Sequence, residues 1–169
     1  SERGYIKAQP RPSKDELDEF YREKYYGENV TSTYQTEYSA AELLQKKLRA
    51  DCTLELVSQN IGVRDSVSLL EIGCGEGFLL SSSNMRGWDT VGVDYQIEPV
   101  RKFNPEVVSR VIQCDPNKYL EELICSDTKK DVVVLQNVLE HVLEPEVLLE
   151  RLATLMHSDS CLVVQVPND

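Results

Sequence analysis

The sequence predicts an α/β fold with a doubly wound, mostly parallel sheet, and three observations predict it. Short runs rich in β-branched residues recur between residues 66 and 169, each separated from the next by a segment able to form a helix. Strands that alternate with helices imply crossover connections and a parallel sheet. The unbroken apolar run Val132–Leu135 is typical of a strand covered on both faces. A glycine-rich turn follows the first of these strands.

Patterns along the chain place the individual elements. The expected strands are Val67–Ile72, Thr90–Val93, Ser109–Cys114, Asp131–Leu135 and Ser160–Val166. The clearest helix of the second half is Pro145–Met156, which begins with proline and has a broad apolar face. Ser13 predicts the N-cap of a helix that starts near Lys14. A second amphipathic helix is expected from about Ser39 to Asn60, ending at Gly62. Its apolar side is expected to hold Leu43, Leu44, Leu48, Cys52, Leu56 and Val57.

The first 65 residues differ in composition from the rest, because they hold six of the eight tyrosines. We expect residues 1–65 to form an N-terminal helical cap or lid and residues 66–169 to form the α/β domain. Four tyrosines are candidates for an acceptor-binding surface, with simple helix packing as the alternative. They are Tyr25, Tyr26, Tyr34 and Tyr38.

Composition excludes several classes of function. The net charge of −11, from 29 acidic and 18 basic residues, repels polyanions, so nucleic acid is not an expected partner. No apolar run is long enough to cross a membrane. Five cysteines without a CxxC pair indicate a reducing, cytoplasmic setting. With two histidines and no paired thiols, a zinc site lacks ligands and no metal site is expected, although counting leaves a carboxylate metal site open.

The stretch LLEIGCGEGFLL, residues 69–80, carries the strongest signal of a ligand. Three of the eight glycines, Gly73, Gly75 and Gly77, fall within five residues between an expected strand and an expected helix. Glycine tolerates positive φ and lets a ligand approach the backbone amides at a helix N-terminus. The alternative is a sharp turn that binds nothing.

The spacing of these glycines bears on the kind of ligand. A dinucleotide fold normally spaces its glycines as GxGxxG around a diphosphate, whereas this chain has GCGEG with Glu71 and Glu76 beside the turn. Two carboxylates oppose a diphosphate and favour a ligand with a positively charged centre.

Polar residues also end the later strands. Asp94 lies 23 residues after Glu71, where an acid can accept hydrogen bonds from ribose hydroxyls, or else cap the next helix. Asp115 could accept from a purine amino group or cap a helix, and Gln136 and Asn137 follow the fourth strand. In an open parallel sheet these carboxyl ends converge on one crevice, which predicts a single binding site.

Taken together, LLEIGCGEGFLL, VGVDY, QCDP and LQNVLEHVLEP over residues 66–169 resemble the class I S-adenosylmethionine-dependent methyltransferases, in particular their small-molecule branch. The resemblance implies a Rossmann-like methyltransferase fold and an enzyme. It implies in-line methyl transfer from S-adenosylmethionine to a small-molecule acceptor, with S-adenosylhomocysteine as product. The acceptor atom stays open between oxygen, nitrogen and carbon.

The resemblance also implies roles for single residues. The three glycines would flank the methionine part of the cofactor, Asp94 would hold the ribose, and Asp115 would meet the adenine amino group. Glu71 would face the methionine amino group, Tyr95 would line the adenine, and Gln136 would pack near the sulfonium. The full set of expected cofactor-binding residues is Glu71, Gly73, Cys74, Gly75, Gly77, Asp94, Tyr95, Cys114, Asp115, Pro116, Gln136 and Asn137.

A hydroxyl acceptor would need a base, and His141 is the expected candidate because histidine titrates in the useful range. A purely structural histidine is the alternative. Asp169 is a second, weaker candidate, and Glu140 is expected to be solvated.

Members of this family normally add two strands after the fifth, so the sheet is expected to lack its last two strands. The open sheet edge makes a homodimer one expected partner state. Two alternative functions are a non-catalytic S-adenosylmethionine-binding module or subunit and a nicotinamide oxidoreductase. GCGEG disfavours the oxidoreductase.

Overall fold

The computed structural model describes residues 10–20 and 37–167, and the chain divides into two units, residues 1–36 and 37–169. In the first unit, helix α1 (Lys14–Glu19) begins after Ser13. The Ser13 Oγ accepts from the Glu16 N–H, and the Glu16 carboxylate accepts from the Ser13 N–H at 2.8 Å. This capping box confirms the predicted helix start. Tyr25, Tyr26, Tyr34 and Asp169 lie outside the described residues.

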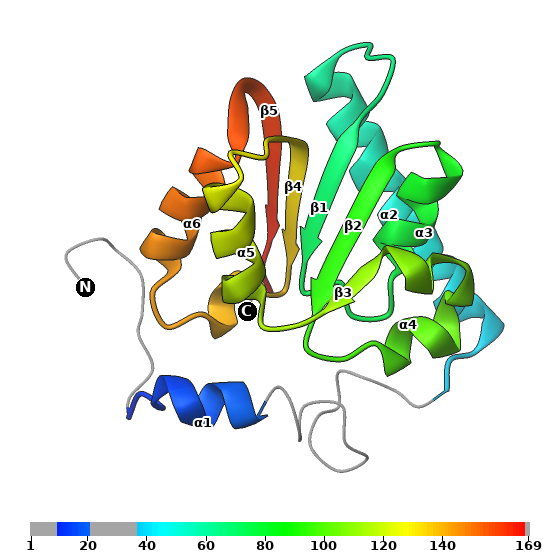
Figure 1. The fold of residues 1–169 in the computed structure, drawn as a ribbon. Coiled ribbons are helices and arrows are strands. Elements are labelled where there is room, and N and C mark those ends of the chain that lie inside the picture. Colours follow the sequence, from blue (N-terminus) through cyan, green and yellow to red (C-terminus); the bar gives the residue numbers. More distant parts are fainter. Residues whose placement is uncertain (1–9, 21–36, 168–169) are drawn as a thin grey trace. The chain divides into compact units, whose positions relative to one another are not determined.

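The second unit is built on a sheet of five parallel strands in the order β3-β2-β1-β4-β5 (Figure 1). The strands are β1 (Ser68–Ile72), β2 (Asp89–Asp94), β3 (Val111–Gln113), β4 (Lys130–Gln136) and β5 (Met156–Gln165). The chain builds outward from β1 to β3 and then crosses back to place β4 on the other side of β1. This reversal confirms the predicted doubly wound fold, and ligands of such folds bind where the order reverses.

Helices cover both faces of the sheet (Figure 1). On one face lie α2 (Ala40–Ile61), α3 (Phe78–Met85), α4 (Glu98–Phe103) and the 3-10 helix η2 (Pro105–Arg110). On the other lie α5 (Pro116–Cys125) and α6 (Pro145–Thr154). Successive strand residues point to opposite faces, so Leu69 packs with the first set and Leu70 with the second.

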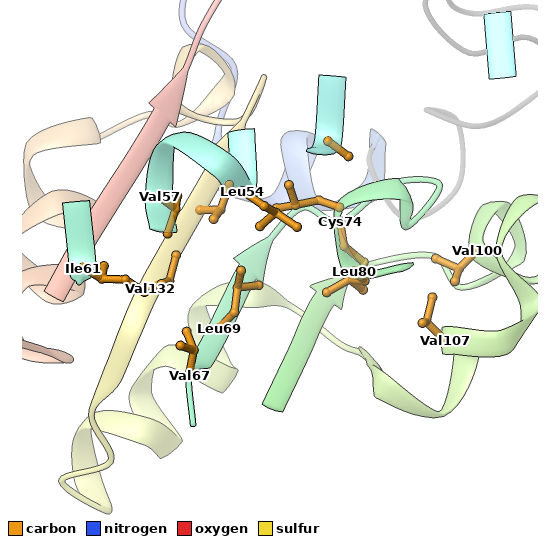
Figure 2. Close-up of a cluster of buried hydrophobic side chains, with 13 residues drawn as sticks. Leu54, Val57, Ile61, Val67, Leu69, Cys74, Leu80, Val100, Val107 and Val132 are labelled. Carbon is orange, nitrogen blue, oxygen red and sulfur yellow. The ribbon is translucent and has the colours of Figure 1, made fainter. Parts of the chain in front are cut away.

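Helix α2 is an integral part of the α/β unit. Its buried residues join β1 and β4 in one apolar core with Leu69 and Val132 (Figure 2). These α2 residues are Ala50, Leu54, Val57 and Ile61. The structure therefore divides the chain after residue 36, which differs from the boundary predicted after residue 65. The physical reason is that a helix with four side chains in the sheet's core cannot be separated from it at low cost.

The face that α2 buries matches the prediction at Val57, which is 1% exposed, and differs from it at most other positions. Leu44, Leu48 and Leu56 are 58%, 54% and 63% exposed, and Cys52 is exposed as well. Residues spaced by four drift around a helix by about 40° per step, so such a row leaves the core face. The buried row is spaced four, three and four residues apart and stays on one side. The predicted end at Gly62, with φ of 70°, is confirmed.

Two strands depart most from their predicted lengths. Strand β3 is only three residues long, because the preceding residues Pro105–Arg110 form η2. Strand β5 starts at Met156, four residues before the predicted Ser160, and its pairing with β4 shifts register between Lys130 and Val132. None of the described helices is long and apolar enough to cross a membrane.

An ionic cluster joins the amino ends of three strands, away from the carboxyl ends. The Asp131 Oδ2 of β4 accepts from the Ser68 N–H of β1 at 2.8 Å and from its hydroxyl at 2.7 Å. Arg64 pairs with Asp131 and, at 2.8 Å, with Asp159 of β5. Burial alone would raise the pKa of Asp131, but the Ser68 hydrogen bonds and the Arg64 charge lower it overall. The cluster therefore ties β1, β4 and β5 at this end.

Candidate functional site

The glycine turn, defined here as residues 73–77, connects β1 to α3. Gly73, Gly75 and Gly77 have φ values of 71°, 53° and 78°, in the left-handed region that other residues rarely adopt. The Gly73 N–H donates to the Val93 carbonyl at 2.8 Å, and the Gly77 N–H donates to the Cys74 carbonyl at 2.9 Å. No side chain hydrogen-bonds as the N-cap of α3, since that position is Gly77. The tight turn expected from the sequence is thus present.

Asp94 ends β2 and is buried beside the glycine turn. Its Oδ2 accepts the Gly75 N–H at 2.9 Å, and its Oδ1 accepts the Gln96 N–H at 3.1 Å. The N-cap of the next helix, α4, is Ile97. Asp94 therefore does not cap α4, and capping was the alternative to ligand binding. Its carboxylate instead joins the end of β2 to the turn that follows β1.

Glu71 is the most deeply buried acid near the turn, with a relative exposure of 3%. Within residues 10–20 and 37–167, its Oε2 has no hydrogen-bond partner. Burial, and secondly the charge of Asp94, raise the pKa of Glu71 well above the usual range. The same burial raises the pKa of Cys74 in the turn. A buried acid of this kind gains a great deal from a cationic or hydrogen-bonding partner.

The ends of β2 and β3 bring the expected adenine-side residues together. The Tyr95 hydroxyl donates to the Asp115 Oδ1 at 3.3 Å, and the Cys114 N–H donates to the Asp94 carbonyl at 3.0 Å. Asp115 is the N-cap of α5, accepting the Asn117 N–H at 2.9 Å, with Pro116 in the first turn. The capping alternative for Asp115 is therefore observed, and its hydroxyl contact with Tyr95 is additional.

The loop after β4 reaches the glycine turn. Asn137 has a φ of 53°, which is unusual for a residue other than glycine. Its N–H donates to the Gln165 carbonyl at 2.8 Å, and the Gln136 amide contacts the Gln165 side chain at 3.3 Å. The next residue, Val138, packs against Gly73 so closely that a Cβ there would lie 2.6 Å from its Cγ2. The ends of β1 and β4 thus meet at these two residues.

His141 lies in the 3-10 helix η3 (Leu139–His141). This short helix lies between β4 and α6, which begins at Pro145. The His141 Nε2 is 3.8 Å from the Glu140 Oε1, and both residues are exposed. Its place as a base stays a prediction.

Two residues beside the turn are not evident from the sequence. Val138 lies within LQNVLEHVLEP but has no polar group that points to a ligand, and Lys46 falls near the start of an amphipathic helix. Lys46 binds Glu76, the acid inside the glycine turn, at 3.2 Å. The one clue to Lys46 in the sequence is Glu76, an acid between two glycines, because a buried charge at that place requires a partner.

In the part of the chain that the structure describes, no group of three or more His, Cys, Asp or Glu residues could hold a metal ion. All five cysteines are free, with Cys74 buried, Cys52 and Cys125 exposed, and Cys114 and Cys161 half-buried.

Solved structures with the same architecture support the fold. A methyltransferase from Archaeoglobus fulgidus, described as S-adenosylmethionine-dependent, has a TM-score of 0.55 at 24% identity, covering 77% of this chain and 59% of that one. The plantazolicin methyltransferase BpumL, in complex with S-adenosylhomocysteine, has a TM-score of 0.62 at 19% identity, covering 87% of this chain and 56% of that one.

Sequence comparison gives the family. A ubiquinone biosynthesis O-methyltransferase of Aeromonas salmonicida is 27% identical over 117 residues, which are 68% of this chain and 49% of that protein. Its counterpart in Nitrosomonas europaea is 26% identical over 107 residues, 62% of this chain and 46% of that protein. The chain spans about half the length of these curated relatives. A family profile described as "Methyltransferase domain" matches residues 28–169. This chain therefore belongs to the methyltransferase-domain family.

Proposed function

We propose that this chain is the donor-binding part of an S-adenosylmethionine-dependent methyltransferase that acts on a small-molecule acceptor. The observation that carries the proposal is the buried Glu71 carboxyl, whose Oε2 lacks a hydrogen-bond partner among the described residues. It lies near the carboxyl end of β1, two residues before the glycine turn, and beside Asp94. Such a group suits a ligand with a positively charged amino-acid end.

The residues present fit the donor, which when bound supplies a methyl group already activated by its sulfonium. The glycine turn offers backbone close to the ligand, because its left-handed residues carry no Cβ. The proposed contacts on the methionine side are Glu71, Gly73, Cys74, Gly75, Gly77, Gln136 and Asn137. The acidic surroundings oppose a diphosphate, which argues against a nicotinamide dinucleotide.

On the nucleoside side, we assign the ribose to Asp94 and the adenine to Tyr95, Cys114, Asp115 and Pro116. Asp94 already accepts two backbone N–H groups, one on each oxygen. The backbone contacts hold the carboxylate in place before the ligand arrives, which lowers the cost of binding.

For the acceptor we propose a hydroxyl-bearing small molecule, supported by the ubiquinone biosynthesis O-methyltransferase names of the relatives. A hydroxyl becomes a good nucleophile when a base removes its proton, and His141 is the proposed base. A histidine side chain that is 40% exposed can exchange the proton with solvent.

Three further features stay predictions. A homodimer could pair β5, which forms one edge of the described sheet and leaves Val164 40% exposed. Light scattering of the purified chain measures this directly. The N-terminal lid and the cytoplasmic location also stay predictions.

Calorimetry tests the donor assignment with this chain alone. S-adenosylhomocysteine should bind, and NAD should give no heat of binding under the same conditions. Binding of NAD without the thioether would overturn the proposal. Turnover of S-adenosylmethionine by the whole protein over a panel of phenolic and alcoholic acceptors then separates an enzyme from a binding module.

A further inference from the structure

The glycine turn contains one charged side chain, Glu76, and partners from another element hold it. Glu76 has a relative exposure of only 8%. The Tyr38 hydroxyl donates to its Oε1, and the Lys46 Nζ lies 3.3 Å from Oε1 and 3.2 Å from Oε2. Tyr38 stands just before α2, and Lys46 lies in that helix. The beginning of α2 is therefore joined to the turn through a buried carboxylate.

Aromatic rings surround this ionic contact. The Tyr38 ring lies 4.9 Å from the Phe103 ring, at the end of α4. The Lys46 Nζ is 4.4 Å from the centre of the Tyr38 ring and 5.6 Å from that of Phe78, the first residue of α3. Burial, and then the hydrogen bond to Glu76, raise the pKa of Tyr38, so the phenol keeps its proton and remains a donor.

The backbone of Glu76 is held as well. Its carbonyl accepts a 2.8 Å hydrogen bond from the Asn104 side chain, which is buried. Asn104 follows α4, so the residue is fixed by α2 at its carboxylate and by the end of α4 at its carbonyl. Its neighbours Gly75 and Gly77 have little conformational preference of their own, which leaves the turn dependent on these contacts.

We propose that Tyr38 and Lys46 are positioning residues, which hold the glycine turn in its ligand-binding conformation through Glu76. The expected effect on ligand affinity rests on the proposed function. The expected effect on the order of the glycine turn does not depend on it. Removing either partner leaves the buried Glu76 carboxylate without one of the groups that stabilise its charge. The turn then moves so that the carboxylate reaches solvent. Coupling between two sites is reciprocal, so ligand in the turn also stabilises the Tyr38 contact.

Three substitutions and one control separate the contributions of Tyr38 and Lys46 to the contact with Glu76. Tyr38→Phe keeps the ring against Phe103 and removes only the hydroxyl. Lys46→Met removes the charge while keeping an apolar stem, and Lys46→Arg restores a cation. Lys47→Met, at the exposed neighbouring position, removes the same charge from the same helix without touching Glu76.

Hydrogen exchange in the free protein tests directly whether Tyr38 and Lys46 order the glycine turn. The Gly75 and Gly77 N–H groups are hydrogen-bonded to Asp94 and Cys74, so their exchange reports the order of the turn. We expect faster exchange at both amides, by about tenfold, in Tyr38→Phe and Lys46→Met. Lys46→Arg and Lys47→Met should behave like the wild type. Unchanged exchange in both Tyr38→Phe and Lys46→Met, in folded protein, would overturn the proposal.

Affinity for S-adenosylhomocysteine tests the functional consequence. We expect Kd to rise about tenfold in Tyr38→Phe and Lys46→Met, and the Tyr38→Phe/Glu76→Gln double variant to lose less than the two single losses combined. Strictly additive losses would contradict an energetic interaction between Tyr38 and Glu76. If the wild-type chain does not bind the thioether, the proposed function is wrong. The hydrogen-exchange comparison then tests the positioning role of Tyr38 and Lys46 without any ligand.

Discussion

The Gly75 N–H donates a 2.9 Å hydrogen bond to the Oδ2 of Asp94, which joins the glycine turn after β1 to the carboxyl end of β2. One carboxylate thus orders the turn, and it is the carboxylate that we propose for the ribose. Asp94→Asn removes its charge and one acceptor oxygen, so we expect the Kd for S-adenosylhomocysteine to rise about tenfold or more. Asp89→Asn, at the exposed start of the same strand, is the matched control and should bind normally. Equal affinities of the two variants in calorimetry would remove Asp94 from the site.

A second prediction uses the contact between Gly73 and Val138. Gly73 and Gly87 have similar φ values of 71° and 77°, but a Cβ at Gly73 meets Val138 at 2.6 Å, while a Cβ at Gly87 meets nothing within 4 Å. Alanine strains the backbone at both positions and adds a clash only at Gly73. Gly73→Ala should therefore lower the free energy of unfolding by about 1–3 kcal/mol more than Gly87→Ala in urea titrations.

The double variant Gly73→Ala/Val138→Ala is the control for that clash. It should regain part of the loss, since the shorter side chain leaves room for the new methyl group. If Gly73→Ala and Gly87→Ala cost the same, the two strand ends do not meet as the structure has them.

A third prediction follows from the raised pKa of Glu71. A folded-state pKa above the unfolded value of about 4.3 means that the native state holds the proton more tightly. Stability from Glu71 is then greatest below that pH and declines as the pH rises toward the folded-state pKa. Glu71→Gln keeps a neutral side chain at every pH, so unfolding free energies measured from pH 4 to 8 should decline less steeply in the variant. Parallel profiles would contradict a neutral, buried Glu71.

Asp131 should behave in the opposite way, because its pKa is lowered. Its contribution to stability is present above the unfolded value of about 3.9 and is lost as the pH falls through the folded-state pKa. Asp131→Asn should cost about 1–3 kcal/mol at neutral pH by breaking the Ser68 and Arg64 contacts. Because the cluster lies at the amino ends of the strands, thioether affinity should not change. A loss of affinity in this variant would show that the two ends are coupled.

A fifth prediction concerns His141 in the whole protein. His141→Ala should lower kcat for a hydroxyl acceptor by about 10²-fold or more, and leave the Kd for S-adenosylhomocysteine unchanged. Turnover equal to that of the wild type would give the histidine a structural role.

Much of the sheet could be predicted from local patterns, because the segments that form β2, β3 and β4 are short and rich in β-branched residues. The strand at Ser68–Ile72 and the glycine turn after it matched closely, since only glycine suits three left-handed positions in five residues. Proline at Pro145 and the capping box at Ser13 likewise fix helix starts through local chemistry.

Other features depend on contacts that the sequence does not encode locally. Several leucines of α2 could form an apolar row, and only packing on β1 and β4 selects Leu54 and Val57 over Leu44 and Leu48. The partners of Glu76 are 30 and 38 residues away along the chain, so no motif predicts them. The side chain of Val138 gains its importance only because Gly73 leaves space for it.

The most direct test of the donor site is the amide spectrum of the folded chain titrated with S-adenosylhomocysteine. We expect saturating ligand to shift the amides of Gly75, Asp94 and Asp115 together, while those at the opposite end, such as Ser68 and Asp131, stay in place. Unmoved amides at all three positions at the carboxyl edge would contradict the account.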